Sequence, residues 1–433
     1  MVGPRLYHNL DIPGQHGIET YEANGGYAAM KTGLAMERSA LVDMVKAAAI
    51  RGRGGAGFPM GNKWGTIPPG AATIYITCNA DESEPGTCSN REILERDPHQ
   101  LVEGLILCAY ALKNVRTCYV YIRGEYRLGY ERLMKALAEA RAKGYVGKNI
   151  LGSGFDLDIW VHRGAGAYIC GEETALIESL EGKRGQPRLR PPFFPTVMGL
   201  MNKPTVVNNV ETIVNILPVV NLGADGYKSW GTEKSPGTKL YCMSGHLKRP
   251  GVYEAPFTVT LRQLIYDFAG GMRNDRKFKT LIPGGASFQW FTEEQLDTVM
   301  GFDEVRAAGS NLGSAGIMVM DETTCAVDAC LSLVHFFAHE SCGKCTPCRE
   351  GTRWMEQMIW RIENGQGRPG EVDQLLDITD NIDGKCFCLL GESSIVSVRS
   401  SIKLFRDEWD HHVTHKKCAV ERDYRLCGKG APH

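Results

Sequence analysis

Three cysteines in the last quarter of the chain stand at a spacing that suits a shared metal centre. They are Cys342, Cys345 and Cys348, each separated from the next by two residues. A fourth thiolate is available at Cys388, and Cys386 competes with it for the same place. Three close cysteines and one distant cysteine are the usual ligands of a 4Fe–4S cluster. A structural zinc site is the alternative, although zinc motifs usually pair their ligands two and two. The spacing therefore favours a centre that moves electrons one at a time.

A glycine-rich run earlier in the chain suits a phosphate group or a flat ring. The run Arg51-Gly-Arg-Gly-Gly-Ala-Gly-Phe58 contains the dinucleotide fingerprint G-x-G-x-x-G. The periodicity of residues 35–50 predicts a helix before the run, where the ordinary dinucleotide fold has a strand. Bare glycine backbone still lets N–H groups approach a ligand closely. With Arg53 and Lys63 beside it, the run predicts an anion site; a flexible surface turn is the alternative.

Residues 73–163 alternate between strand and helix patterns. Runs rich in β-branched and aromatic residues predict strands at 73–79, 117–122 and 155–162. Helical patterns lie between them, at 98–112 and 126–141. Such alternation is typical of a largely parallel sheet, and ligands bind such sheets at the carboxyl ends of the strands.

Acidic and glycine-rich segments follow two of these strands. After the first strand come Asn79, Asp81, Glu82 and Glu84. These side chains suit the hydroxyl groups of a ribose or ribityl chain, and a solvated acidic turn is the alternative. After the third strand, a glycine loop at 164–171 leads into two glutamates at the start of a helix. A helix N-terminus favours anions, so stabilising the helix dipole is the alternative role of these glutamates.

A long basic loop and a polar segment complete this part of the chain. Residues 182–204 contain four basic residues and two phenylalanines, which would clamp a nucleotide by charge and stacking. A solvated linker is the alternative. Asn208 and Asn209 then interrupt an apolar stretch, where they would bind ligand or cap a helix at 212–220.

The second half of the chain predicts two units of different architecture. Residues 237–322 follow a four-strand, one-helix pattern that resembles a β-grasp domain, and nothing in it suggests chemistry. From residue 324, four helical patterns predict a bundle with the cysteine loops at one end. The last of these helices is predicted at 394–409.

Further metal-ligand residue types follow the bundle. His411, His412 and His415 are predicted to form a solvated helix end, since the sequence fixes no cysteine or carboxylate beside them. Cys418 and Cys427 lie in a polar tail and have no predicted role.

Together these patterns predict an α/β chain of five segments. They are an N-terminal arm at 1–34, a Rossmann-like parallel-sheet domain at 35–236, a β-grasp (ubiquitin-like) docking domain at 237–323, a four-helix bundle carrying the iron–sulfur cluster at 324–415, and a tail at 416–433.

The composition is that of an ordinary globular protein. The chain has 433 residues, of which 43% are hydrophobic and 23% charged, with a formal net charge of −1. This balance gives no sign of nucleic-acid binding. No apolar run approaches the 18 or so residues that a membrane span needs, so no direct membrane insertion is expected. Fifteen cysteines are too dilute for a disulfide scaffold and indicate a reducing compartment.

These motifs, in this order, resemble a known family. The matching segments are Arg51-Gly-Arg-Gly-Gly-Ala-Gly-Phe-Pro59, Cys78-Asn-Ala-Asp-Glu-Ser-Glu-Pro-Gly-Thr87, Gly164-Ala-Gly-Ala-Tyr-Ile-Cys-Gly-Glu-Glu-Thr-Ala-Leu176, Val207-Asn-Asn-Val-Glu-Thr212 and Glu340-Ser-Cys-Gly-Lys-Cys-Thr-Pro-Cys-Arg349. The family is that of the NADH-binding, FMN-containing, F-type flavoprotein component of respiratory complex I, NADH:quinone oxidoreductase. The resemblance extends over about residues 20–415.

The resemblance implies a site for FMN, for the substrate NADH and for a 4Fe–4S cluster. It implies that Cys342, Cys345, Cys348 and Cys388 bind the cluster and that Glu172 lies near the site of hydride transfer. The residues implied to contact FMN or NADH are Gly52, Arg53, Gly54, Gly55, Gly57, Phe58, Gly61, Lys63, Asn79, Asp81, Glu82, Glu84, Tyr168, Gly171, Glu172, Glu173, Val207, Asn208, Asn209 and Thr212.

The resemblance also implies partners and a location. The partners are a thioredoxin-like 2Fe–2S subunit and the large iron–sulfur subunit, at the cytoplasmic face of the bacterial inner membrane or on the matrix side in mitochondria. The alternative is the diaphorase subunit of a soluble NAD-dependent hydrogenase or formate dehydrogenase, which shares these motifs. Those chains often carry added ferredoxin-like cysteine segments, and none is visible here.

Several positions depart from the family's pattern. Asn62 stands where leucine is usual, and Cys88 and Asn90 stand where an aromatic and an acidic residue are common. Beside the fourth cysteine, Leu389-Leu-Gly-Glu392 replaces Ala-Leu-Gly-Asp.

Overall fold

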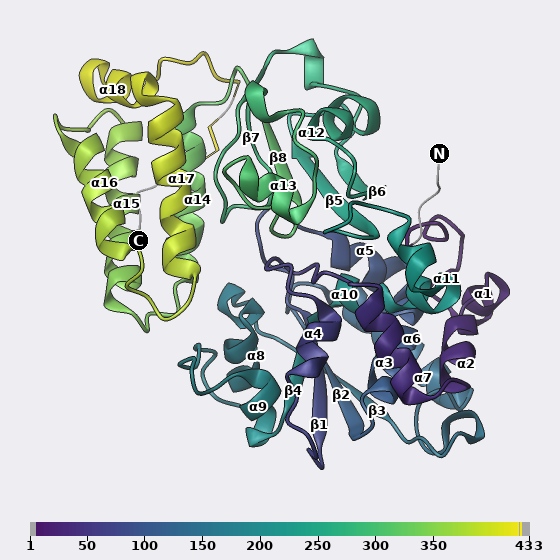
Figure 1. Cartoon of the computed structure of the whole chain (residues 1–433). Helices are drawn as coiled ribbons and strands as arrows, with labels where there is room; N and C mark the ends of the chain where they lie inside the picture. Colours follow the sequence, from purple (N-terminus) through teal and green to yellow (C-terminus); the bar gives the residue numbers. More distant parts are fainter. Residues whose placement is uncertain (1–5, 424, 427–433) are drawn as a thin grey trace.

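The computed structural model describes residues 6–423, 425 and 426, which form three adjoining parts (Figure 1). A parallel sheet with its helices lies at the bottom of the view, a smaller mixed sheet lies above it, and a helical bundle stands at the upper left. Cys427 lies outside the described residues.

The parallel sheet has four strands in the order β3-β2-β1-β4. They are β1 (Ile74–Ala80), β2 (Val115–Ile122), β3 (Asp158–Arg163) and β4 (Thr205–Asn209). The three predicted strands are confirmed. The fourth strand was missed because its asparagines look like a break, although four of its five residues are buried. From β1 the chain runs outward through β2 and β3 and then returns to the other side of β1. The crevice between β1 and β4 is therefore a topological switch point, where such sheets bind ligands.

Eleven helices of the described chain accompany this sheet. They are α1 (Ile18–Ala23), α2 (Ala28–Leu34), α3 (Arg38–Ala47), α4 (Met60–Gly65), α5 (Ser89–Arg96), α6 (Pro98–Ala111), α7 (Arg127–Ala142), α8 (Glu173–Leu180), α9 (Pro195–Met198), α10 (Val210–Val214) and α11 (Ile216–Lys228). The predicted helices at 35–50, 98–112 and 126–141 correspond to α3, α6 and α7. The helix predicted at 212–220 is divided between α10 and α11.

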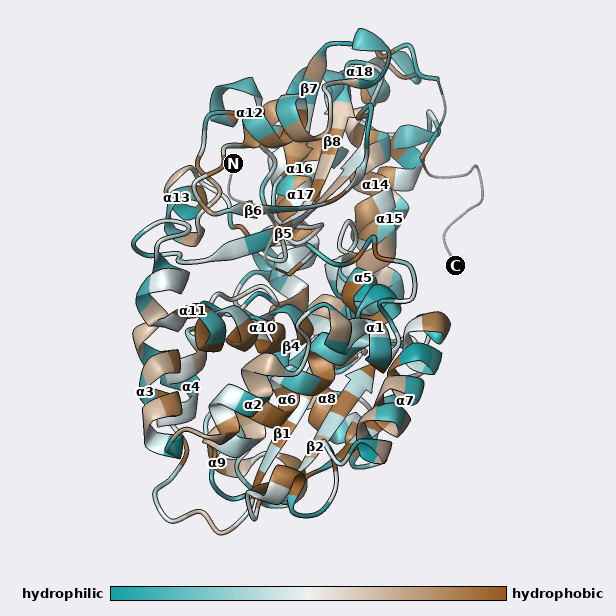
Figure 2. Ribbon diagram, turned by 90° about the vertical axis from the view of Figure 1, so that its right-hand side faces the viewer, coloured by the Kyte–Doolittle hydropathy of each residue, from teal (hydrophilic) through white to brown (hydrophobic). Residues whose placement is uncertain are grey.

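The alternation of side chains along β1 separates two cores. Ile74, Ile76 and Cys78 pack with α6 and α7 in the main core on one face of the sheet. Tyr75 points to the opposite face, where Ile177 of α8 belongs to a smaller core. Figure 2 shows the hydrophobic residues gathered around the strands and α6, whereas α7 on the outside mixes hydrophobic and hydrophilic residues.

The prediction of an irregular N-terminal arm is wrong for residues 18–34, which form α1 and α2. The buried carboxylate of Glu103 on α6 accepts hydrogen bonds from Tyr21 Oη, from Tyr27 N at 2.8 Å and from Met30 N at 2.9 Å. Because these bonds connect residues more than 70 positions apart, no local pattern could reveal them.

The second sheet has the order β6-β5-β8-β7. Its strands are β5 (Thr238–Gly245), β6 (Gly251–Pro256), β7 (Phe278–Ile282) and β8 (Gly316–Asp321). The outer pairs are antiparallel and the central pair β5–β8 is parallel. Its helix starts at α12 (Leu261–Gln263), where Thr260 forms the predicted capping box. The short helix α13 (Phe302–Ala307) was not predicted. The arrangement agrees with the expected β-grasp pattern.

The carboxyl-terminal part is a bundle of α14 (Ala326–Glu340), α15 (Thr346–Glu363), α16 (Glu371–Ile382) and α17 (Leu390–Leu404), followed by α18 (Arg406–His415). The last helix predicted at 394–409 is wrong in one respect, because the backbone leaves the helical region at Phe405 (φ −135°) and begins a separate helix. Successive helices run up and down, so the cysteine loops before α15 and before α17 lie at the same end. In Figure 1 that end faces α8.

The prediction of a solvated histidine cluster is wrong for His412, whose side chain is fully buried. His411 and His415 remain at least partly exposed. No helix in the described part of the chain is both long and apolar enough to cross a membrane.

Candidate functional site

Two adjoining cavities lie at the carboxyl ends of β1 and β4. The main cavity has a volume of about 690 Å³, and the inner cavity has a volume of about 350 Å³. Both are lined by Gly54, Asn79, Gly171, Glu172 and Asn209, so they are two parts of one cleft.

Nineteen of the twenty predicted FMN- or NADH-contacting residues line this cleft. The main cavity also has Gly52, Gly55, Gly57, Phe58, Lys63, Glu173, Val207, Asn208 and Thr212. The inner cavity also has Arg53, Asp81, Glu82, Glu84 and Tyr168. The exception is Gly61, which lies outside both cavities. A Cβ atom on Gly61 would stand 2.8 Å from Cα of Lys46, so this glycine allows α4 to pack closely on α3.

The glycine run presents bare backbone to the cleft. A Cβ atom on Gly54 would lie 2.9 Å from Cβ of Asn209, so only glycine fits between the run and the end of β4. Thr212 Oγ1 accepts a hydrogen bond from Arg53 N at 2.8 Å, which fixes the run against α10. The side chain of Arg53 is buried and donates to Tyr227 Oη at 2.9 Å and to the carbonyl of Pro236 at 3.1 Å. Its guanidinium is therefore structural.

A cation and two carboxylates line the main cavity. Lys63 Nζ donates to the carbonyl of Val207 at 2.9 Å and lies 3.5 Å from Glu173 Oε2. Arg190, from the long basic loop, pairs with Glu172 at 3.2 Å and with Glu173 at 2.6 Å. Phe194 of the same loop is half exposed at the cavity wall. These contacts support the prediction that part of the loop at 182–204 faces a ligand.

Glu172 caps the helix that follows it. Its Oε2 accepts hydrogen bonds from Thr174 N at 3.0 Å and from Ala175 N at 2.9 Å. The alternative role predicted for this glutamate, stabilising the helix start, is therefore present, and the same carboxylate also lines both cavities. Asn209 likewise caps α10 through Glu211 N, at 2.9 Å, while it faces the cleft.

The acidic segment after β1 divides into structural and ligand-facing groups. Glu82 accepts hydrogen bonds from Asn90 N at 2.9 Å, Arg91 N at 3.0 Å and Tyr126 Oη at 2.9 Å, so its carboxylate holds the start of α5. Asp81 Oδ2 has no hydrogen-bond partner within the part of the chain that the structure describes. Burial raises the pKa of Asp81 to about 7. A buried acceptor without a partner fits a hydroxyl-bearing ligand.

The buried Asp81 predicts a pH dependence of stability in the flavin-free chain. Because the folded state holds the proton more tightly than the unfolded state, wild-type stability falls as pH rises toward 7. Asp81→Asn removes this titration. Relative to wild type, we expect the variant to gain about 2–3 kcal/mol between pH 5 and pH 8. Urea unfolding across that range measures the difference, with the exposed Asp225→Asn as control. A difference that stays constant with pH would contradict the assignment.

The smaller sheet contributes residues to the cleft that the sequence analysis missed. Glu84 accepts hydrogen bonds from Tyr168 Oη at 2.6 Å and from Ser287 N at 2.9 Å. A Cβ atom on Gly285 (φ +110°) would stand 2.6 Å from Cγ of Glu84, so the approach requires glycine. Ser314 also lines the inner cavity. The prediction that the β-grasp part lacks any role at the site is therefore wrong; the run Pro283-Gly-Gly-Ala286 was the available signal.

The four predicted cluster cysteines lie together at the end of the bundle. Cys348 packs in one apolar cluster with Leu176 of α8, and Cys342, Cys345, Cys386 and Cys388 border that cluster. Burial raises the pKa of Cys348 to about 11 and of Cys388 to about 12. A bound metal cluster would be needed to hold these groups as thiolates at neutral pH.

The spacing of these sulfurs separates the two alternatives for the metal. Zinc bonded to four thiolates at about 2.3 Å holds neighbouring sulfurs about 3.8 Å apart. Within the described chain, no three of the five sulfur atoms here lie within 4.8 Å of one another. The wider arrangement fits a multi-iron cluster and does not fit a single zinc ion.

The fourth ligand position separates Cys388 from Cys386. Cys388 lines the inner cavity beside Glu172 and Tyr168. The thiol of Cys386 instead approaches the carbonyl of Ile382 at the end of α16, at 3.8 Å. The placement of Cys388 joins the cysteine end of the bundle directly to the cleft.

Several hydrogen bonds hold the cysteine loop against the sheet domain. Tyr168 N donates to Glu340 Oε2 at 3.0 Å, which connects the second glycine loop to the start of the cysteine motif. Gln186 Nε2 donates to the carbonyl of Cys342 at 3.1 Å, and Lys344 Nζ donates to the carbonyl of Pro187 at 2.5 Å. The distance between cleft and cysteines is thus fixed by side chains from both parts.

Comparisons with known proteins agree with this arrangement. The family model described as Nuo51 FMN-binding domain matches residues 45–218. The model described as NADH-ubiquinone oxidoreductase-F iron-sulfur binding region matches residues 328–412. These two regions contain the cleft and the cysteine motif respectively.

Relatives match nearly the entire chain. The F 2 subunit of the NADH-quinone oxidoreductase of Rhizobium meliloti (strain 1021) is 50% identical over 96% of this chain and 99% of its own length. The F subunit of the Streptomyces coelicolor enzyme is 51% identical over 93% of this chain and 90% of its own length. Among solved structures, a chain of an NAD+-reducing [NiFe]-hydrogenase in the H2-reduced state aligns with a TM-score of 0.81 and 34% identity, covering 92% of this chain and 67% of that one. The chain belongs to the family of F subunits of NADH-quinone oxidoreductases.

Proposed function

We propose that the cleft holds FMN and NADH together and that electrons leave it toward a 4Fe–4S cluster bound by Cys342, Cys345, Cys348 and Cys388. The chain is the NADH dehydrogenase module of its enzyme, with FMN, an iron–sulfur cluster and NADH as substrate. The position of Cys388 carries the proposal, because this cysteine lines the same cavity as Asn79, Asp81 and Glu172.

The chemistry requires a converter between two-electron and one-electron carriers. Bound FMN accepts a hydride from NADH and can release electrons singly, as an iron–sulfur cluster requires. The hydride step needs no acid or base from the protein. The protein has to hold the two rings in contact and keep the cluster close.

The residues of the cleft divide this task between them. The bare backbone of the glycine run and Lys63 suit the phosphate of FMN. Asn79 and the unpartnered oxygen of Asp81 suit the hydroxyl groups of its ribityl chain. Phe58, Arg190 and Phe194 surround the larger cavity and suit the nicotinamide nucleotide. Glu172 lies at the junction of the two cavities, where the rings would meet.

Reduction of the flavin by NADH tests this proposal. The flavin-loaded full chain is titrated with NADH under argon, and the visible absorbance of the flavin is followed. We expect bleaching at close to one NADH per flavin before excess NADH accumulates. Failure of a fully flavin-loaded chain to bleach would contradict the assignment of the cleft.

Glu172→Gln is expected to change NADH binding or the flavin potential more than stability. Glutamine keeps an oxygen that can accept from Thr174 N and Ala175 N, so the cap of α8 persists, while the ion pair with Arg190 is lost. Glu172→Ala removes the cap as well and should cost about 1 kcal/mol of stability. The measurements are KM for NADH, the flavin midpoint potential and the thermal unfolding midpoint. Unchanged kinetics together with an unchanged potential would remove Glu172 from the site.

We also propose the five segments named above as domains, with the arm extended into a helical segment that packs on α6. The partners proposed are a thioredoxin-like 2Fe–2S subunit and the large iron–sulfur subunit, at the cytoplasmic face of the bacterial inner membrane. Names of relatives support an iron–sulfur partner of this kind.

The structural match to the NAD+-reducing [NiFe]-hydrogenase favours a second candidate, the diaphorase subunit of such an enzyme. The higher identity to quinone-reductase subunits supports the first candidate. Purification of the chain with its native partners separates the two, because a hydrogenase would bring nickel and a quinone reductase would not.

A further inference from the structure

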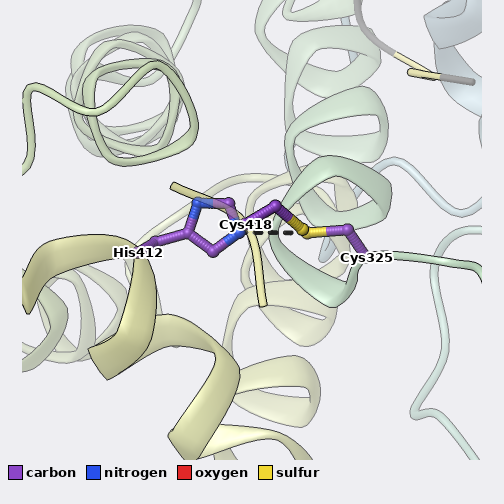
Figure 3. A group of neighbouring side chains, drawn as sticks. All are labelled: Cys325, His412 and Cys418. Carbon is purple, nitrogen blue, oxygen red and sulfur yellow. Dashed lines mark hydrogen bonds between the residues drawn. The ribbon is translucent and has the colours of Figure 1, made fainter. Parts of the chain in front are cut away.

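Two cysteines and a histidine meet in the bundle, away from the cleft and the cysteine motif (Figure 3). Cys325 immediately precedes α14, His412 lies on α18, and Cys418 follows α18. One ligand atom from each lies within 4.8 Å of the other two. The sulfur of Cys325 is 3.3 Å from Nε2 of His412. Within the described chain, no other group of three such residues is this close.

These distances fit one tetrahedral metal ion. Zinc lies about 2.3 Å from sulfur and about 2.0–2.1 Å from imidazole nitrogen, which places neighbouring ligand atoms about 3.5–3.8 Å apart. Small rotations of the three side chains would reach that geometry. Two thiolates and one imidazole are ligands that zinc prefers over calcium or magnesium. The contrast with the widely spaced cysteines at the other end of the bundle is direct.

A carboxylate stands behind the imidazole. Oε2 of Glu363 is 3.7 Å from Nδ1 of His412 and 3.9 Å from the sulfur of Cys325. Its other oxygen is held by Arg422 at 2.6 Å and by Arg425 at 3.1 Å. Histidines that bind metal through Nε2 commonly direct Nδ1–H to a carboxylate, which fixes the ring and raises its basicity. His412 and Glu363 have this arrangement.

The surroundings of the sulfurs also favour thiolate. The backbone N–H of Val420 donates to the sulfur of Cys418 at 3.3 Å. Hydrogen bonds from Cys325 and then from His412 lower the pKa of the Cys418 thiol. Cys325 and His412 are buried, whereas Cys418 is partly exposed, so an ion can enter from the side of Cys418.

We propose that Cys325, His412 and Cys418 bind one zinc ion, with the fourth position filled by water or by Glu363. The zinc would fasten the segment after α18 to the start of α14. That segment also reaches the smaller sheet, because Asp423 pairs with Arg276. Leu426 N donates to Asp328 of α14 at 2.7 Å. The ion would therefore stabilise the junction between the bundle and the β-grasp part and take no part in electron transfer.

Zinc analysis of the full chain with its flavin and iron tests this proposal. Cells are grown with zinc, and the purified protein is assayed for metals and by zinc-edge X-ray absorption. We expect about one zinc per chain, with two sulfurs at about 2.3 Å and at least one nitrogen at about 2.0–2.1 Å. Because the method is specific for zinc, the iron cluster does not interfere. A zinc-free protein, or zinc surrounded by sulfur alone, would overturn the proposal.

Variants provide the second half of the test. Cys418→Ser is expected to weaken zinc binding by at least about tenfold, and Glu363→Gln by about 10–100-fold. Cys330→Ser, in the same helix as Cys325 but outside the group, should retain zinc. Cys345→Ser should lose iron and retain zinc. A Cys325–Cys418 disulfide in peptide maps made without reductant, or zinc lost with Cys345→Ser instead of Cys418→Ser, would contradict the assignment.

Discussion

Replacing Cys388 with serine is expected to remove about four iron atoms per chain and to leave FMN bound. The serine hydroxyl is a poor ligand for iron at neutral pH, and the three remaining cysteines would hold an incomplete cluster. NADH should still bleach the flavin, because the glycine run and the strand ends are untouched. Iron and flavin analysis, with NADH titration of the same sample, measures both effects.

The matched control is Cys386→Ser, two residues away. The thiol of Cys386 approaches the carbonyl of Ile382 and does not line the inner cavity. We therefore expect this variant to keep the cluster and its NADH-driven reduction. The opposite pattern, with iron lost from Cys386→Ser and kept by Cys388→Ser, would reverse the fourth ligand and break the proposed connection between cleft and cluster.

Gly54→Val is expected to weaken flavin binding by at least about tenfold, which corresponds to about 1.4 kcal/mol. The first carbon of a valine side chain would already stand 2.9 Å from Cβ of Asn209, and its methyl groups would enter the space shared by the two cavities. Crowding of this kind also costs about 1–3 kcal/mol of stability. Flavin fluorescence during titration of the flavin-free chain measures the affinity.

Gly65→Ala provides the control for this prediction. Gly65 ends α4, and a Cβ atom built there meets no heavy atom within 4 Å. Flavin affinity should therefore equal that of the wild type. Normal flavin affinity in a folded Gly54→Val chain would show that the run does not approach the ligand, and the assignment of the glycine run would fail.

The sequence predicted best what depends on local pattern. The strands β1, β2 and β3 and the helices α6 and α7 follow from residue periodicity, and the cleft follows from polar residues at strand ends. The cysteine spacing likewise predicted one shared centre. Each of these inferences uses neighbours in the chain, and short runs of residues carry that information.

What the sequence did not reveal depends on contacts between distant segments. The partners of Glu103 lie more than 70 residues away, and so the helices α1 and α2 were missed. Ser287 reaches Glu84 across 203 positions. His412 lies 87 positions from Cys325, and for this reason it resembled a solvated helix end. The strand β4 was missed for a different reason, since its two asparagines serve the site at the expense of strand propensity.

The structure also assigns different tasks to residues that the sequence placed in one group. Glu82 and Arg53 are both buried beside the cleft, yet their charged groups hold α5 and the junction with the smaller sheet. Asp81 and Lys63 present their polar atoms to the cavities. Position in a motif therefore did not determine which side chains face the ligand.

Low-temperature EPR of the full chain, frozen after anaerobic addition of NADH, tests the path of electrons most directly. Our account predicts an iron–sulfur signal that NADH produces in the wild type and in Cys386→Ser, and that is absent when flavin is removed. The signal should also be absent from Cys388→Ser. A cluster that NADH reduces equally well without flavin, or that stays oxidised beside fully reduced flavin, would contradict transfer from the cleft to these four cysteines.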